Sequence, residues 1–106
     1  METKTLSLPR LNRLNPTLES TALKLMEEAG ELAQVIGKFR GLSGERVSFD
    51  QGEIIKQIAR ELLDVAQTAV TMMFVMEEQH GIDLSLMVQE HLNKLERKGY
   101  FKPSSE

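Results

Sequence analysis

The chain of 106 residues has no cysteine, no tryptophan and only three prolines. Without cysteine it can form neither a disulfide nor a thiolate-based catalytic, zinc or iron–sulfur site. Its 13 basic and 16 acidic residues give a formal charge of −3, which argues against a domain built to bind nucleic acid or an anionic membrane. No apolar run approaches the ~20 residues of a membrane span, and no signal peptide is visible at the start. We therefore expect one cytoplasmic domain, with neither a membrane nor a nucleic-acid polymer as partner.

The first helix is predicted from the few prolines and glycines. Asn15 followed by Pro16 is typical of a helix start, with the asparagine as N-cap and the proline in the first helical position. This helix should run over residues 16–40 and end at the Gly-Leu-Ser-Gly sequence of residues 41–44. The preceding residues 1–15 are interpreted as an extended N-terminal arm.

Two further helices follow the same kind of signals. Asp50 and Glu53 have the spacing of a capping box, which predicts a second helix extending to about His80. Asp83 is the expected N-cap of a third helix over about residues 84–98. No segment alternates polar and apolar residues as a strand would.

Apolar residues recur every three or four positions in the first two predicted helices, which predicts an antiparallel bundle whose helices face each other across these stripes. The stripes consist of Leu18, Ala22, Leu25, Ala29, Leu32, Ile36 and Phe39, and of Ile55, Ile58, Leu62, Val65, Ala69, Met72 and Met76. The second helix is also apolar beside its stripe, which exceeds what two other helices can cover. We expect an all-α domain over residues 16–99, completed by homo-oligomerisation, and a polar tail over residues 100–106.

Two acidic clusters border these stripes. Each contains two acids three residues apart, which places their carboxylates on neighbouring turns of one helix face. On a helical wheel Glu28 and Glu61 lie about 70° from the stripe centres, and Glu31 and Asp64 about 130°, in the same rotational sense. Across two antiparallel helices these four acids can converge along one seam, whereas Glu27 points away.

Converging carboxylates repel one another unless a cation lies among them. Oxygen ligands suit Mg²⁺ or Mn²⁺ better than zinc or copper, and neither pair has the Glu-x-x-His spacing of di-iron bundles. Magnesium held by carboxylates keeps positions open for phosphate oxygens, so phosphoryl chemistry on a nucleotide would be a natural use. The alternative is that these acids form an ordinary solvated helix face. Gly30, in mid-helix between the acids, suggests that another helix or a ligand approaches closely.

Residues 25–33 (LMEEAGELA), followed by residues 61–65 (ELLDV), resemble the motif of the MazG-like, all-α nucleoside triphosphate pyrophosphohydrolases. That motif is Glu-Glu-x-x-Glu, a spacer, and Glu-x-x-Asp, and the resemblance extends over about residues 17–99. It implies an enzyme that hydrolyses nucleoside triphosphates between the α and β phosphates, with Mg²⁺ and possible use of Mn²⁺. It also implies a homo-oligomer, either a dimer or a tetramer.

Carried over by position, the resemblance implies that Glu28, Glu31, Glu61 and Asp64 are the magnesium ligands. Glu27, the first glutamate of the motif, belongs to the implied catalytic set. A water activated by the metal and a carboxylate would attack the α-phosphorus.

Four basic residues are candidate phosphate contacts: Lys38, Lys94, Arg97 and Lys98. The family's last helix often ends in a Lys-Asn-Arg constellation, but here the asparagine is missing from the expected place. Basic residues are also favoured at helix C-termini by the helix dipole, which is the alternative explanation.

Two other functions stay open at this point. One is a non-catalytic helical oligomerisation module whose acids are surface charge. The other is a phosphoribosyl-ATP pyrophosphohydrolase, which shares the chemistry of the wider superfamily.

Overall fold

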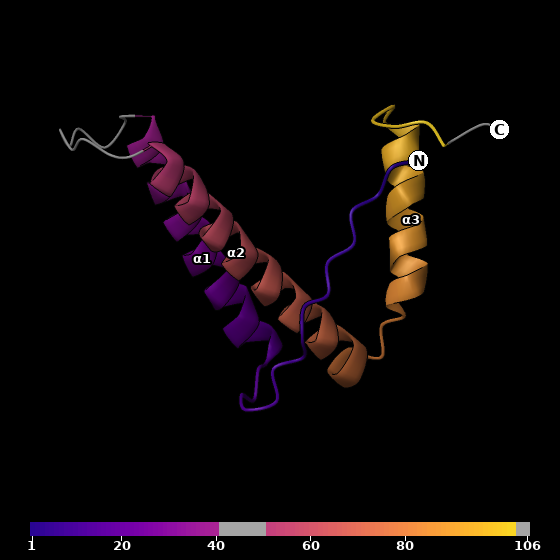
Figure 1. Cartoon of the computed structure of the whole chain (residues 1–106). Helices are drawn as coiled ribbons and strands as arrows, with labels where there is room; N and C mark the ends of the chain where they lie inside the picture. Colours follow the sequence, from indigo (N-terminus) through magenta and orange to yellow (C-terminus); the bar gives the residue numbers. More distant parts are fainter. Residues whose placement is uncertain (41–50, 104–106) are drawn as a thin grey trace.

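The computed structural model describes residues 1–40 and 51–103, and in these ranges the chain forms three helices and no strand (Figure 1). They are α1 (Leu18–Phe39), α2 (Gln51–His80) and α3 (Leu84–Arg97). The all-α prediction is therefore confirmed. The predicted break at residues 41–44 and the Asp50 cap lie outside the described residues. Among the described helices, none combines the length and apolar character needed to cross a bilayer.

Helix α1 begins two residues later than predicted. The N-cap is Thr17 rather than Asn15, because Thr17 and Ser20 form a reciprocal capping box. The Ser20 N–H donates to Thr17 Oγ1 at 3.0 Å, and the Thr17 N–H donates to Ser20 Oγ at 2.8 Å. These two bonds satisfy amide groups that would otherwise lack partners at the helix start, so the prediction of Asn15 was wrong.

The other described helix ends follow the prediction. Helix α2 ends at His80, and Gly81 adopts a φ of +64°, a left-handed conformation that glycine tolerates best. The Asp83 carboxylate accepts a hydrogen bond from the Leu86 N–H at 3.1 Å and so caps α3.

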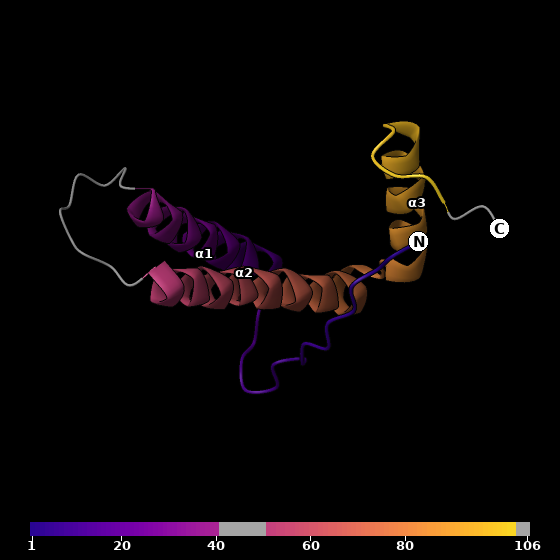
Figure 2. The same ribbon diagram turned by 45° about the horizontal axis from the view of Figure 1, so that its top comes forward.

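Helices α1 and α2 pack side by side and run antiparallel (Figure 2). The predicted apolar stripes do not form the centre of this contact: Ile36, Ile55 and Leu62 are exposed, whereas Leu25, Leu32, Ile58 and Val65 are partly buried beside it. Most of the buried positions recur every seven residues: Thr21, Glu28 and Val35 on α1, and Ile54, Thr68 and Val75 on α2, with the partly buried Glu61 in the same series and Thr71 as one further buried position. Both helices are thus turned so that a glutamate lies in the middle of the seam. The prediction that the helices face each other across the stripe centres was wrong, because the contact is shifted from the centre of each stripe toward the side that carries the glutamate.

A single chain has little core. Among the described residues only Val35, Ile54 and Val75 are buried apolar side chains, and α3 has no buried residue. Helix α3 stands apart from the α1–α2 pair in both views (Figures 1 and 2). The radius of gyration is 17.4 Å, whereas a compact domain of about 100 residues has about 13 Å. Much of the apolar surface of α1 and α2 is therefore available to pack against something else.

The arm before α1 is attached to α2. Gln67 Nε2 donates to the Pro9 carbonyl at 2.9 Å, and Gln79 Nε2 donates to the Pro16 carbonyl at 3.1 Å. Arg10 forms an ion pair with Glu78. These contacts, which are between 58 and 68 residues apart in the sequence, hold the arm against the pair of long helices.

Candidate metal centre

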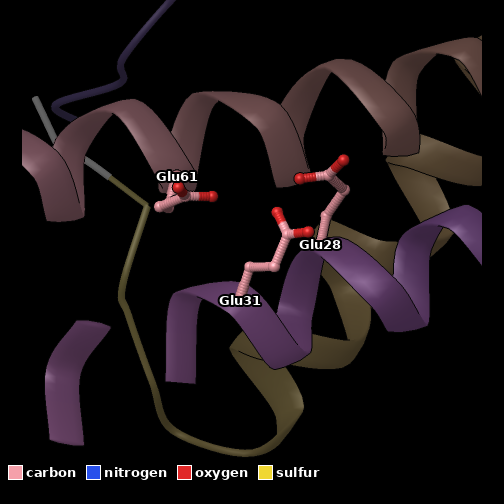
Figure 3. Close-up of side chains that lie close together, drawn as sticks. All are labelled: Glu28, Glu31 and Glu61. Atoms are coloured by element: carbon pink, nitrogen blue, oxygen red, sulfur yellow. The ribbon is translucent and has the colours of Figure 1, made fainter. Parts of the chain in front are cut away.

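Three carboxylates converge between α1 and α2. Glu28 and Glu31 lie on consecutive turns of α1, and Glu61 lies on α2 where the two helices face each other. One oxygen from each can be chosen so that all three lie within 4.8 Å of one another. Figure 3 shows the three side chains pointing into the space between the helices. The acid-x-x-acid spacing and the antiparallel packing together produce this convergence.

Glu28 is the most buried of the three, with only 7% of its surface exposed. Its Oε1 lies 3.1 Å from Lys24 Nζ, whereas its Oε2 is buried and has no hydrogen-bond partner in the described part of the chain. The same holds for Oε2 of Glu61. A buried carboxylate oxygen without a partner is costly, and nearly all such groups in folded proteins are satisfied. Two of them at one place indicate a site for a positively charged ligand.

The electrostatics of the cluster are unfavourable for full ionisation. The pKa of Glu31 is raised above its ordinary value, first by the negative charge of Glu28, then by desolvation and by the charge of Glu61. One positive charge is close by, because Lys24 lies between Glu28 and Glu27, at 3.1 and 3.7 Å. One lysine against three clustered carboxylates leaves an excess of negative charge that a divalent cation can offset.

The raised pKa of Glu31 predicts how stability depends on pH. Between the ordinary carboxyl pKa of about 4.5 and the raised value, the folded metal-free chain binds more protons than the unfolded chain. Its free energy of unfolding should therefore fall as the pH rises through this window. Glu31→Gln should reduce that slope, as measured by urea unfolding at fixed protein concentration without divalent metal. Glu77→Gln, which removes an exposed acid from α2, is the control, and a slope unchanged by Glu31→Gln would contradict the prediction.

Asp64 and Glu27 lie outside this cluster of three. Asp64 is exposed, one turn after Glu61, and lines a pocket that also reaches Glu28. Glu27 has a 59% exposed side chain, in keeping with its predicted orientation. Gly30 also differs from expectation, because a Cβ built on it would meet no atom within 4 Å in the described part of the chain.

The four basic candidates are not brought to the acids within one chain. Lys38 lies in the last turn of α1, and the other three lie at the end of α3, which stands apart from the pair (Figure 1). Lys98 is placed over the ring of Tyr100, 6.0 Å from its centroid. Their role as phosphate contacts stays a prediction.

Lys24 and the pocket beside Glu28 were missed from the sequence. Lys24 precedes Glu28 by four residues, and this spacing alone could have predicted their ion pair. The pocket was not predictable in the same way. It is formed where the arm crosses the helix pair, and the spacing of apolar residues does not predict where an extended segment packs.

Helical bundles build metal sites from side chains on facing helices, and α1 and α2 bring acidic residues together in this way. A family model for the MazG nucleotide pyrophosphohydrolase domain matches residues 16–99. The chain belongs to this family, and the resemblance inferred from its motifs is confirmed. No curated protein and no solved structure matches the chain. Membership of the family supports nucleotide pyrophosphohydrolase activity.

Proposed function

We propose that the protein is a Mg²⁺-dependent hydrolase that cleaves ribo- or deoxyribonucleoside triphosphates between the α and β phosphates, releasing a nucleoside monophosphate and pyrophosphate. The observation that carries this proposal is the convergence of Glu28, Glu31 and Glu61, with two buried carboxylate oxygens that lack a partner. The match to the MazG domain over residues 16–99 supports the same reaction.

The residues of the cluster fit a hard divalent cation. The ligand atoms are all carboxylate oxygens, which suit Mg²⁺ or Mn²⁺. The repulsion between the carboxylates would be relieved by the two positive charges of such an ion. We assign Glu28, Glu31 and Glu61 as ligands and Asp64, at the edge of the adjoining pocket, as the fourth carboxylate of the set. When bound, the ion lowers the pKa of water and offsets charge on the phosphate oxygens.

The protein's own groups then have separate tasks. A carboxylate of the cluster accepts the proton of the attacking water, which adds to the α-phosphorus while the bond to the bridging oxygen breaks and pyrophosphate leaves. Lys24, beside Glu28, supplies a fixed positive charge at the rim of the cluster. The seam between α1 and α2 holds Glu28 in place, because this side chain is buried among packed residues.

We also propose that the working form is a homo-oligomer. Fourteen large hydrophobic side chains are exposed in the described part of the chain, against three that are buried, and a helix of 14 residues with no buried side chain is marginal on its own. Packing against further copies would cover these faces. In such an assembly, Lys94, Arg97 and Lys98 of one copy could reach the acids of another.

The reaction is tested by a screen of all ribo- and deoxyribonucleoside triphosphates with Mg²⁺ and with Mn²⁺. We expect pyrophosphate and the monophosphate in equal amounts, and no activity after the metal is chelated. Release of orthophosphate would contradict cleavage between the α and β phosphates. If no nucleotide is cleaved and millimolar Mg²⁺ leaves the melting temperature unchanged, the chain would instead act as a helical oligomerisation module.

A further inference from the structure

A pocket of about 440 Å³ lies between the N-terminal arm and the α1–α2 pair. Its outer wall is made by Leu11, Leu14 and Pro16 of the arm. The helices contribute threonine hydroxyl groups and, at one end, the carboxylates of Glu28 and Asp64. The volume lies within the range of small-molecule sites, about 300–1,000 Å³, and the mixture of apolar walls and a few polar groups is typical of them.

The pocket is continuous with the metal centre through Glu28, which belongs to both. At this shared end, the Glu28 side chain is more than nine-tenths buried and its Oε2 lacks a hydrogen-bond partner in the described residues, which marks this end of the pocket as the place for a charged group. Any molecule whose charged end is bound at the carboxylates can therefore extend into the pocket.

The distribution of charge indicates which part of a nucleotide the pocket would receive. Its charged lining residues, Lys24, Glu28 and Asp64, are on the two helices, whereas the lining residues from the arm are uncharged. An anionic phosphate belongs at the cation, and a neutral nucleoside suits the apolar end. Among the residues that the structure describes, no aromatic side chain lines the pocket, so the base would be held by aliphatic contacts and by the amides of Asn15 and Gln67.

The arm wall is formed before any ligand binds. Gln67 holds the Pro9 carbonyl, Arg10 pairs with Glu78, and Gln79 holds the Pro16 carbonyl. These three attachments lie on either side of Leu11 and Leu14. Because the arm is already attached, less conformational entropy is lost when a ligand binds, and this favours selective recognition.

We propose that this pocket binds the nucleoside part of the substrate, and that Leu11 and Leu14 of the arm determine which base and sugar are accepted. This inference rests on the proposed function and adds to it the element that confers specificity. It assigns a direct substrate contact to the arm, which lies outside the acidic motifs.

The test compares Leu14→Ala with Leu6→Ala, since Leu6 is an exposed leucine of the same arm that does not line the pocket. For Leu14→Ala we expect KM for the preferred nucleotide to rise about tenfold, with kcat changed less than about twofold. The dissociation constant of the monophosphate product should rise similarly, and that of magnesium pyrophosphate should not change. Leu6→Ala should behave as wild type in all these measurements.

The outcomes separate the pocket from the reaction. If the wild-type chain releases pyrophosphate but Leu14→Ala has an unchanged KM for every nucleotide, the pocket assignment is overturned and the proposed reaction stands. If the wild-type chain cleaves no nucleotide, both are overturned.

If Leu14→Ala loses its helical circular dichroism signal, ligand binding to the pocket is tested on the wild-type chain instead. Titration of ¹⁵N-labelled protein with nucleoside monophosphate should shift the amide signals of residues 11 and 14. Shifts confined to residues outside the arm would overturn the proposal.

Discussion

Replacing Glu61 by glutamine is expected to lower pyrophosphate release at least about 100-fold while preserving the helical fold. Outer-shell partners of a metal typically change affinity or activity about 10–100-fold, so the loss of a direct ligand should exceed this range. The same substitution should stabilise the metal-free chain, because it removes one of three carboxylates whose oxygens lie within 4.8 Å of one another.

The two effects of Glu61→Gln are measured separately. Pyrophosphate release is followed with the best substrate of the nucleotide screen. Thermal melting is recorded with and without Mg²⁺, which at 100 times its dissociation constant should add about 2.7 kcal/mol to the wild-type free energy of unfolding. Glu61→Gln should lose most of that gain.

Glu77→Gln removes an exposed acid from the same helix and should leave both the activity and the effect of Mg²⁺ as in wild type. If Glu61→Gln retained the wild-type rate of pyrophosphate release, the assignment of the metal centre would be wrong.

The second large effect is expected from charges placed on the exposed apolar face of α2. Ile55 and Met73 are 51% and 46% exposed in the single chain, and the proposed oligomer would cover them. The double substitution Ile55→Lys with Met73→Lys should dissociate the oligomer, because two lysines would be buried without partners in the interface. The separated chains should also lose much of their helical circular dichroism, since each has only three buried apolar side chains among its described residues.

Sedimentation at micromolar concentration and circular dichroism on the same samples measure this prediction. The control is Gln57→Lys, which adds one lysine at an exposed polar position of α2 and should leave the assembly intact. A wild-type chain that sediments as a stable, folded monomer at micromolar concentration would contradict the proposed oligomer.

Helix positions were largely predictable because the relevant signals are local. Asp83 and Gly81 act on amides and carbonyls within one turn of their own position, and both have their expected roles. The start of α1 was missed because Thr17 competes with Asn15 for the N-cap position. The reciprocal hydrogen bonds between Thr17 and Ser20 satisfy two backbone N–H groups at the helix start.

The acidic site was predictable for a related reason. Glu28 and Glu61 lie at corresponding angles on their helices, so antiparallel packing on that side brings them together when they are at the same height along the pair. The contact is shifted from the centre of each predicted stripe toward the side that carries Glu28 and Glu61, so these carboxylates lie in the seam itself. Asp64 is exposed and is not brought into the cluster, whereas Glu31, which follows Glu28 by one turn and is also exposed, is part of it.

By itself, the sequence determined the all-helical class, the family and the acids that approach one another, because each depends on spacing along a helix. Only the tertiary structure decided that Glu28 is buried in the seam and that the arm forms a pocket beside it. These features depend on contacts between residues up to 68 positions apart. The rotation of a helix and the path of an extended arm are set by packing over such distances, and local periodicity does not specify them.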